Sequence, residues 1–231
     1  MKRRFNPAVQ EIMDQPQPLS AALEQDLHNL RQLNRFFGSY DLIRHFLRQW
    51  LVPGKSFRVL DLATGSGDIP RLVAQYSRQI GASVSIDAID GQEPTLEIAK
   101  RLSSDYPEIT FHHGDIRDWG DIATYDIVLC SLVLHHFGET DAVRVLAHAA
   151  ALSRRHVLVA DLRRGLLGTV GVFLLTTFMF RHPMTRHDAR LSAARAFSSD
   201  ELRELARQAG WRNFQHSNFR FARQAVWLDL G

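Results

Sequence analysis

The sequence predicts an α/β protein with an open, mostly parallel sheet that helices cover on both faces. Short apolar segments that favour strands alternate with longer segments whose apolar residues recur at helical spacing. Parallel strands in this order need helical crossovers, and these pack against both faces of the sheet. The chain has 231 residues and is 45% hydrophobic, which is enough to bury the core of one large domain.

Seven candidate strands alternate with helical patterns along the chain. Gly38 is expected to divide the first helical stretch, residues 20–52, into two helices. Residues 181–195 are polar, and we expect them to be irregular, whereas Ser198 begins a capping box that opens a helix. The candidate strands are residues 57–62, 84–89, 109–113, 125–130, 156–161, 214–219 and 225–230, and helical patterns cover residues 69–76, 94–102 and 140–152.

The composition excludes several classes of protein. A single cysteine, Cys130, rules out an internal disulfide framework and a cysteine zinc cluster, and it suits a reducing, cytoplasmic location. The net charge is only +3 and the arginines are interleaved with acidic residues, so we expect no nucleic-acid partner. No apolar segment follows the basic N-terminus, so we expect no signal peptide.

One apolar run, residues 165–180, stands out between flanking arginines. As a helix it would span about 24 Å, which is short of the ~30 Å hydrocarbon core of a membrane. We expect a helix that is buried or that caps a site, and peripheral contact with a membrane surface is the alternative. Phe173 in this run is a candidate contact for an apolar substrate.

The strongest motif is the glycine loop that follows the first candidate strand, from Asp61 to Gly67. Glycines at such a turn let the backbone approach a ligand closely, and the following helix offers free N–H groups. A dinucleotide-binding loop needs a third glycine where this chain has Pro70. The carboxylate of Asp61 would repel a pyrophosphate but attract a cationic ligand that carries an amino acid.

Acidic residues also end the next two candidate strands. Asp90 and Gly91 close the second strand, where a carboxylate can accept both hydroxyls of a ribose; a helix N-cap is the other interpretation. Asp115 follows the third strand. Its carboxylate is placed to accept an adenine amino proton while Ile116 covers the ring, and a simple turn is the alternative.

Together these motifs resemble those of the class I S-adenosylmethionine-dependent methyltransferases, over roughly residues 55–162. The resemblance implies a Rossmann-like, doubly wound, mostly parallel seven-stranded sheet with an antiparallel last strand, N-terminal helices and a helical cap insertion. It also implies a methyltransferase whose cofactor is S-adenosylmethionine. The glycine loop would hold the methionine part of this cofactor, and Ser131 would lie beside its sulfonium end. The implied cofactor-binding residues are Asp61, Ala63, Gly65, Gly67, Asp90, Gly91, Asp115, Ile116 and Ser131.

Residues 29–35, 161–165 and 183–188 also resemble segments of the ubiquinone/menaquinone-type and phenolic-lipid methyltransferases of bacteria. This resemblance implies a small apolar acceptor, a phenol or a quinol such as a phenolic lipid from a polyketide pathway. The methyl group would go to oxygen, with a ring carbon as the alternative. We expect an N-terminal helical cap at 1–54 and a methyltransferase domain at 55–231, with a cap insertion at about 165–195.

Three histidines are the candidate catalytic residues: His135, His136 and His187. Residues 131–137 read SLVLHHF, without the proline-rich pattern typical of enzymes that methylate amino groups, so a histidine that removes a hydroxyl proton fits better. His135 and His136 are adjacent, so we expect only one of them to face the cleft. Arg186 is a candidate contact for an anionic oxygen of the substrate.

Other assignments follow from these patterns. We expect no metal site, because no two histidines lie at i, i+4 with an acid near a shared face. A nicotinamide-dependent oxidoreductase on the same kind of sheet is one alternative function, although Pro70 argues against it. A non-catalytic subunit that binds the cofactor without turnover is another. The oligomeric state is left open.

Overall fold

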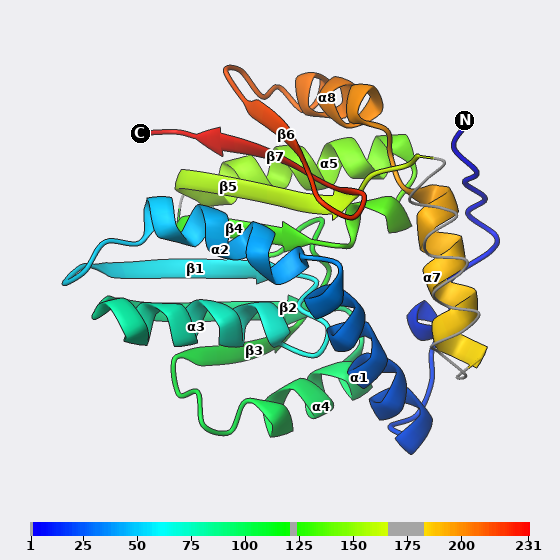
Figure 1. Cartoon of the computed structure of the whole chain (residues 1–231), viewed down its shortest axis with the longest axis horizontal. Helices are drawn as coiled ribbons and strands as arrows, with labels where there is room; N and C mark the ends of the chain where they lie inside the picture. The colour runs from blue at the N-terminus through cyan, green and yellow to red at the C-terminus, as the bar shows by residue number, and fades with distance from the viewer. Residues whose placement is uncertain (1, 121–123, 166–182) are drawn as a thin grey trace.

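A computed structural model describes residues 2–120, 124–165 and 183–231. Seven strands form one sheet in the order β3-β2-β1-β4-β5-β7-β6 (Figure 1). Neighbours among β1 to β5 are parallel, and β7 runs antiparallel to both β5 and β6. The predicted doubly wound sheet is therefore confirmed. The strands are β1 (Ser56–Leu62), β2 (Ser83–Asp90), β3 (Ile109–His113), β4 (Tyr125–Ser131), β5 (Ser153–Leu162), β6 (Gln215–Phe219) and β7 (Arg223–Asp229).

Helices cover both faces of this sheet because successive strand residues point to opposite sides. On β4, Ile127 and Leu129 belong to the core cluster that also contains residues of α2 and α3. Val128 and Cys130 belong to the cluster with α5 and α8. The helices are α1 (Ala21–Phe36), α2 (Ser39–Trp50), α3 (Asp68–Ile80), α4 (Glu93–Leu102), α5 (Glu139–Leu152), α7 (Pro183–Arg195) and α8 (Ser199–Gln208).

Local signals set several of the helix boundaries where the sequence predicts them. Gly38, with φ +72°, separates α1 from α2. The Ser198 side chain accepts the backbone N–H of Glu201, and the Glu201 side chain accepts the N–H of Ser198, so the predicted capping box opens α8. In both cases a short sequence pattern was sufficient to predict the helix boundary, because the residues that set the boundary lie within a few positions of one another.

Helix α7 (Pro183–Arg195) occupies a segment that the sequence predicts to be irregular, so that prediction is wrong. Its buried residues are largely polar, and they bond to the N-terminal segment. The hydroxyl of Ser192 donates to Glu11 at 2.7 Å, and the carboxylate of Asp188 accepts the backbone N–H of Ile12 at 2.8 Å. Distant polar partners therefore hold this helix in place of the apolar stripe that periodicity detects.

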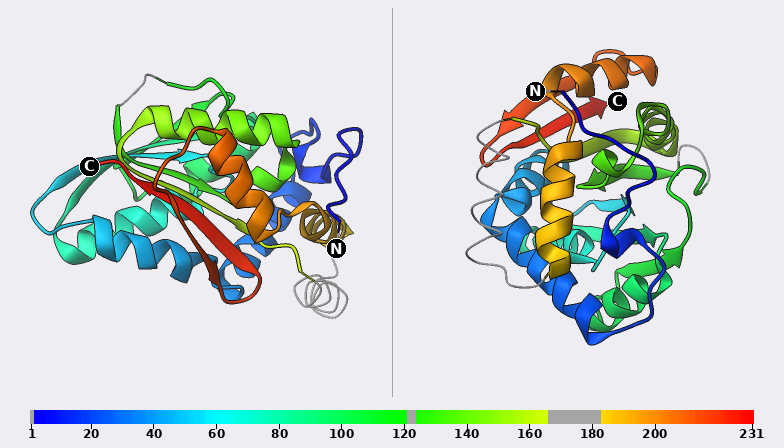
Figure 2. Two further views of the ribbon diagram at one scale, coloured as in Figure 1. Left: turned by 90° about the horizontal axis from the view of Figure 1, so that it is seen from above. Right: turned by 90° about the vertical axis from the view of Figure 1, so that its right-hand side faces the viewer.

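The N-terminal segment and two helices cross the carboxyl ends of the parallel strands. The chain before α1 contains a short 3₁₀ helix, η1 (Ile12–Asp14), which contacts α7. Figure 2 shows α1, α7 and this segment in front of the sheet when it is seen from its carboxyl edge. A second 3₁₀ helix, η2 (Leu134–His136), follows β4 at the same edge. This layer encloses the region where ligands of doubly wound sheets bind.

The apolar run at 165–180 lies outside the described residues except for Gly165, and Phe173 lies outside them as well. Among the described residues, none of the helices combines the length and the apolar character needed to cross a bilayer. The antiparallel final strand β7 follows α8 and β6, as the resemblance implied.

Candidate active site

A cavity of about 810 Å³ opens at the carboxyl ends of β1, β2, β3 and β4. Strand order reverses between β1 and β4, so the cavity lies at the topological switch point of the sheet. Its volume falls in the usual range for small-molecule sites, roughly 300–1,000 Å³. Residues of η1, α1 and α7 line the side of the cavity opposite the strand ends.

The predicted cofactor-binding residues meet at this cavity with one exception. Gly67 is absent from the lining, and it precedes α3 with φ +73°. A Cβ added there would lie 3.0 Å from the ring of Phe111, so Gly67 permits the turn and the packing of α3. The residues that do line the cavity are Asp61, Ala63, Gly65, Asp90, Gly91, Asp115, Ile116 and Ser131.

The glycine loop follows β1 with a left-handed backbone at several positions. Gly65 has φ +54° and open space beside its Cα, which leaves room for close approach of a ligand. Ala63 has φ +58°, a conformation that an alanine adopts at a cost of about 1–2 kcal/mol. The loop thus has, at Ala63, a backbone conformation that glycine adopts more readily than alanine.

Asp61 presents an unsatisfied carboxyl oxygen to the cavity. The residue is 2% exposed, and its Oδ2 has no hydrogen-bond partner among the described residues. Burial raises the pKa of Asp61 to about 8. Buried polar atoms normally find partners, so this oxygen is suited to a ligand that supplies a positively charged donor.

Asp90 connects the two adjoining strand ends. Its Oδ2 accepts the backbone N–H of Gly65 at 2.8 Å and its Oδ1 accepts that of Gln92 at 2.9 Å. Burial raises the pKa of Asp90 above its ordinary value. Each carboxylate oxygen can accept a second bond, so Asp90 can shape the loop and still accept hydroxyl donors from a ligand.

Asp115 and Ile116 lie at the end of β3 as the sequence predicts. Asp115 bonds to the backbone and side chain of Arg117, and the side-chain hydrogen bond lowers the pKa of Asp115. Ile116 is 5% exposed and contributes an apolar wall to the cavity. An ionised acceptor beside an apolar wall suits the edge and face of a heteroaromatic ring.

His135 is held by Asp161, the carboxylate on β5. Nδ1 of His135 lies 2.6 Å from Oδ1 of Asp161, and its backbone N–H donates to Oδ2 at 2.9 Å. Because a carboxylate only accepts, Nδ1 carries the proton, and Nε2 is the proton-free nitrogen of the neutral ring. Nε2 lies 4.0 Å from Oε1 of Glu11 in η1's flanking segment.

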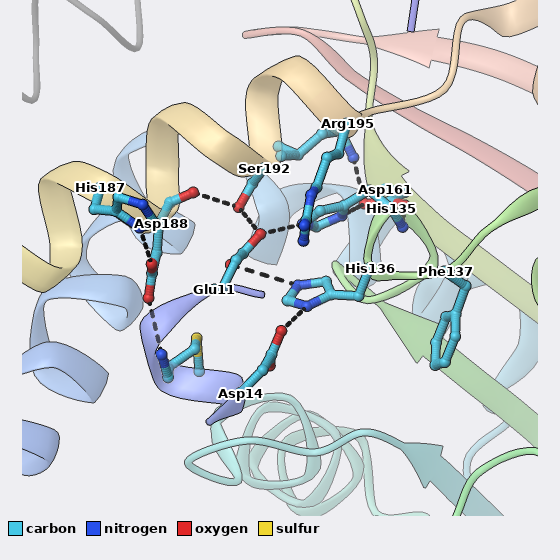
Figure 3. A network of polar contacts seen from close by, with 12 residues as sticks. Glu11, Asp14, His135, His136, Phe137, Asp161, His187, Asp188, Ser192 and Arg195 are labelled. Atoms are coloured by element: carbon cyan, nitrogen blue, oxygen red, sulfur yellow. Dashed lines mark hydrogen bonds and ion pairs between the residues drawn. The ribbon is translucent and has the colours of Figure 1, made fainter. Parts of the chain in front are cut away.

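His136 has a parallel arrangement with different partners. Its Nδ1 lies 2.6 Å from Oδ2 of Asp14, and its Nε2 lies 3.7 Å from Oε2 of Glu11. Burial disfavours a charge on this ring, but the carboxylates of Glu11 and Asp14 outweigh it and raise the pKa of His136 to about 9. Figure 3 shows both imidazoles turned toward Glu11.

The two adjacent histidines therefore face the same cavity, contrary to expectation. Their ring centroids are 4.4 Å apart, and both residues line the cavity. They lie in the 3₁₀ helix η2, where neighbouring side chains are not forced to opposite faces as they are in a strand. Together with Glu11 they form a group that could hold a metal ion, and the i, i+4 spacing argument against a metal site does not cover it.

His187 and Arg186 lie away from this cavity. Both line a shallow depression on the outer side of α7, together with Arg4 and Arg190. Nδ1 of His187 lies 2.8 Å from Oδ1 of Asp188, and its side chain is 47% exposed. The helical turn explains this placement, because Asp188 and Ser192 share the inward face of α7 and His187 is carried outward.

The structure adds residues that sequence reasoning missed. Asp161 ends the predicted fifth strand at the carboxyl edge, so its position in the sheet could have identified it. Glu11 and Asp14 carry no such signal, since they precede the first long helix in a polar stretch. Arg195 also lines the cavity, and its Nε has no hydrogen-bond partner among the described residues.

Comparisons with known proteins agree with this geometry. Residues 59–156 match a family model described as a methyltransferase domain. A 2-phytyl-1,4-naphtoquinone methyltransferase of Thermosynechococcus vestitus is 28% identical over 107 residues, which cover 46% of this chain. The matched part spans less than half of that relative, 43% of its length.

Solved structures share the fold over most of the chain. A SAM-dependent methyltransferase from Aquifex aeolicus has a TM-score of 0.59 at 15% identity, covering 97% of this chain and 98% of that one. A magnesium protoporphyrin IX methyltransferase from Synechocystis PCC 6803, solved with bound SAH, has a TM-score of 0.59 at 18% identity, covering 93% and 90%. Residues 59–156 therefore match a methyltransferase-domain family, and the chain shares its fold with S-adenosylmethionine-dependent methyltransferases.

Proposed function

We propose that this chain binds S-adenosylmethionine in the main cavity and transfers its methyl group to a small apolar phenol or quinol. The observation that carries the proposal is the gathering of Asp61, Asp90 and Asp115 around one cavity at the switch point of the sheet. The match of residues 59–156 to a methyltransferase domain supports this proposal. The S-adenosylhomocysteine bound in the similar magnesium protoporphyrin IX methyltransferase supports the choice of cofactor.

The cavity residues fit the parts of this cofactor. Asp61 has a buried, unpartnered oxygen for the ammonium group of the methionine part. Asp90 has acceptor capacity for ribose hydroxyls, and Asp115 with Ile116 forms a polar edge and an apolar wall for adenine. Ser131 ends β4 where the sulfonium end would lie. When bound, S-adenosylmethionine supplies an electrophilic methyl group.

The side of the cavity nearest the N-terminal segment carries several apolar side chains beside its polar groups, and these suit a hydrophobic acceptor. This wall combines side chains from the N-terminal segment, α1 and the region after β4, and an enclosed apolar surface favours an apolar molecule over water. The quinone named for the similar Thermosynechococcus protein supports the same class of acceptor. The apolar residues of this wall are Phe5, Met13, Leu27, Leu30, Leu33, Phe37 and Phe137.

The histidines at the cavity suit transfer to oxygen. The acceptor hydroxyl loses its proton as its oxygen bonds to the methyl carbon, and the carbon–sulfur bond breaks. His135, with its Nδ1 beside Asp161, presents Nε2 to take that proton. His136, with a pKa of about 9, is positively charged near neutral pH and stabilises negative charge on the oxygen. Methylation at a ring carbon of a quinol is the alternative that the same groups support.

The N-terminal part of the chain takes part in this proposal as a cap. We assign residues 1–54 to the cap and residues 55–231 to the methyltransferase domain with its insertion at about 165–195. The lining of the cavity by η1 and α1 supports that division, since these elements cover the acceptor side. A cap that excludes water holds the acceptor in line with the methyl group, which is the main contribution expected of the protein.

A thermal-shift titration with S-adenosylhomocysteine tests cofactor binding on the full chain. At about 100 times Kd the product should raise the Tm by roughly 5–10 °C. Asp90→Asn should reduce the shift. Asp87→Asn is the matched control on the same strand, because Asp87 bonds to His112 and Tyr125 away from the cavity and should leave the shift unchanged.

Methyl transfer is then measured by mass spectrometry with phenols and quinols of increasing chain length. The proposal expects a gain of one methyl group in the acceptor and an equal amount of S-adenosylhomocysteine. A Tm that responds to NADH and ignores S-adenosylhomocysteine would point to an oxidoreductase and contradict the proposal. Cofactor binding without turnover on any phenol or quinol would contradict the enzymatic part and favour a binding subunit.

A further inference from the structure

Glu11, His135 and His136 come together from two distant parts of the chain. Glu11 belongs to the N-terminal segment, and the histidines follow β4 in η2. One ligand atom from each of the three side chains lies within 4.8 Å of the other two. All three residues line the main cavity, on the side that the proposed function gives to the acceptor.

We infer that Glu11, His135 and His136 form a binding site for one divalent transition-metal ion at the acceptor side of the cavity. Two imidazoles and one carboxylate are a donor set that suits zinc, iron or nickel rather than magnesium or calcium. Three protein ligands leave a coordination position open, as in catalytic metal sites.

The distances are close to those of a formed site. Ligand atoms that lie 2.0–2.2 Å from a tetrahedral ion are separated by about 3.3–3.6 Å. Nε2 of His135 and Nε2 of His136 lie 4.0 Å and 3.7 Å from the two oxygens of Glu11. The three ligand atoms lie within 4.8 Å of one another, so side-chain movements of about an ångström would bring them to one ion.

Each histidine is already oriented for coordination through Nε2. Asp161 lies 2.6 Å from Nδ1 of His135, and Asp14 lies 2.6 Å from Nδ1 of His136. In the neutral ring a carboxylate on Nδ1 fixes the tautomer with a proton-free Nε2 and makes that nitrogen a better ligand, so binding of the ion displaces the second proton of His136. Both rings have a carboxylate beside Nδ1, as histidine ligands in metal sites usually do. A single catalytic base would need such a carboxylate on only one of the two rings.

The charges around the cluster favour a cation. Carboxylates of Glu11, Asp14 and Asp161 contact the two histidines (Figure 3). The cations nearest to it are guanidinium groups. Those of Arg3 and Arg195 bond mainly to backbone carbonyls, so they leave the carboxylate oxygens exposed to another positive charge.

The open coordination position would face the acceptor oxygen. An ion there lowers the pKa of a bound hydroxyl, so that its proton leaves to solvent, and it stabilises the resulting oxyanion. With the ion bound, it takes the place of the proton acceptor on His135 and of the charge on His136. This role rests on the proposed function, whereas binding of the ion does not. The two can therefore fail separately.

Metal analysis of the purified full chain, without a histidine tag, tests the site. After removal of metals with a chelator and incubation with Co²⁺ or Zn²⁺, the protein should retain about one equivalent per chain. Co²⁺ should give the visible absorption bands of a site with nitrogen ligands. Glu11→Gln and His136→Ala should each lower the affinity at least 10-fold, in line with the loss of a ligand.

His112→Ala is the matched control, because His112 Nε2 also lies 2.7 Å from an aspartate, Asp87, but has no second imidazole. The His112→Ala variant should still retain about one equivalent of metal per chain. Circular dichroism and the S-adenosylhomocysteine shift on the same samples confirm folding, and the Co²⁺ spectrum of the wild-type chain requires no substitution.

Three outcomes would overturn the site. The folded wild-type chain could retain no metal, or His112→Ala could lose as much metal affinity as Glu11→Gln and His136→Ala. The third outcome is a Co²⁺ spectrum that lacks the bands of nitrogen coordination. A chain that binds S-adenosylhomocysteine but no metal would refute the metal site and leave the proposed function intact. A chain that binds metal but not S-adenosylhomocysteine would refute the proposed function and leave the metal site intact.

Discussion

Asp161 holds His135 through both of its carboxylate oxygens, one 2.6 Å from Nδ1 and the other accepting the backbone N–H at 2.9 Å. These bonds connect the C-terminal end of strand β5 to the 3₁₀ helix η2, which follows β4 at the carboxyl edge of the sheet. Because both groups are buried, the pair fixes the direction of the ring as well as its tautomer. The free nitrogen of His135 is aimed at the acceptor side of the cavity by the fold itself.

Asp61→Asn should stabilise the ligand-free protein and weaken cofactor binding. Burial raises the pKa of Asp61 to about 8. Between about pH 4 and pH 8 the folded protein holds a proton that the unfolded chain has released, so stability falls as the pH rises through this window. Asparagine stays neutral at every pH. The gain in unfolding free energy of Asp61→Asn over the wild type should therefore be small near pH 4 and reach roughly 1–3 kcal/mol at pH 8.

Urea unfolding across this pH range measures the gain in stability, and calorimetric titration with S-adenosylhomocysteine measures the loss of affinity, which should be about 10- to 100-fold. Asp41→Asn is the control, since the Asp41 side chain is 83% exposed and should show neither effect. An equal gain in stability at pH 4 and at pH 8 would contradict the explanation from the raised pKa.

Ala63→Gly should raise stability because it relieves a left-handed alanine. The φ of Ala63 is +58°, and glycine adopts this conformation without steric cost. The expected gain in unfolding free energy is about 1 kcal/mol, with cofactor affinity nearly unchanged. Ala147→Gly, inside α5, should instead cost about 0.5–1 kcal/mol. Destabilisation by both substitutions would show that the loop conformation is not strained.

Asp188→Ala should release the N-terminal segment from α7. The carboxylate of Asp188 accepts the backbone N–H groups of Ile12 and Met13 at 2.8 and 3.0 Å. Loss of these charge-assisted bonds should cost roughly 1.5–3 kcal/mol and raise KM for the acceptor more than Kd for S-adenosylhomocysteine.

Hydrogen exchange gives the specific readout for this change. The amides of Ile12 and Met13 should exchange much faster in Asp188→Ala, while amides in the centre of the sheet keep their protection. Asp200→Ala provides the comparison, because that side chain is 95% exposed on α8. Unchanged exchange at Ile12 in Asp188→Ala would mean that other contacts hold the segment.

Short-range patterns predicted most of the sheet and the cofactor side of the cavity. Each strand candidate corresponds to an observed strand with small shifts at its ends, as at residues 84–89 against Ser83–Asp90. Asp61, Asp90 and Asp115 could be placed together in advance because parallel strands end at one edge. Gly67 was assigned to the same side; it is absent from the lining of the cavity, and it permits the turn into α3.

The acceptor side was much harder to predict because its groups come from segments far apart in the sequence. His187 was expected at the site, but α7 carries it to the outer surface. Glu11 reaches His135 and His136 across more than half of the chain. No local periodicity marks such an approach, since it depends on how the N-terminal segment crosses the sheet and bonds to α7.

The sequence alone determined the alternation of strands and helices, the glycine loop and the match of residues 59–156 to a methyltransferase domain. These features depend on contacts between near neighbours and on the rule that parallel strands end together. Tertiary structure alone decided that two adjacent histidines face one carboxylate, and that Asp14 and Asp161 support them from opposite sides. The physical reason is that side-chain hydrogen bonds and charge pairs act over a few ångströms in space, without regard to separation along the chain.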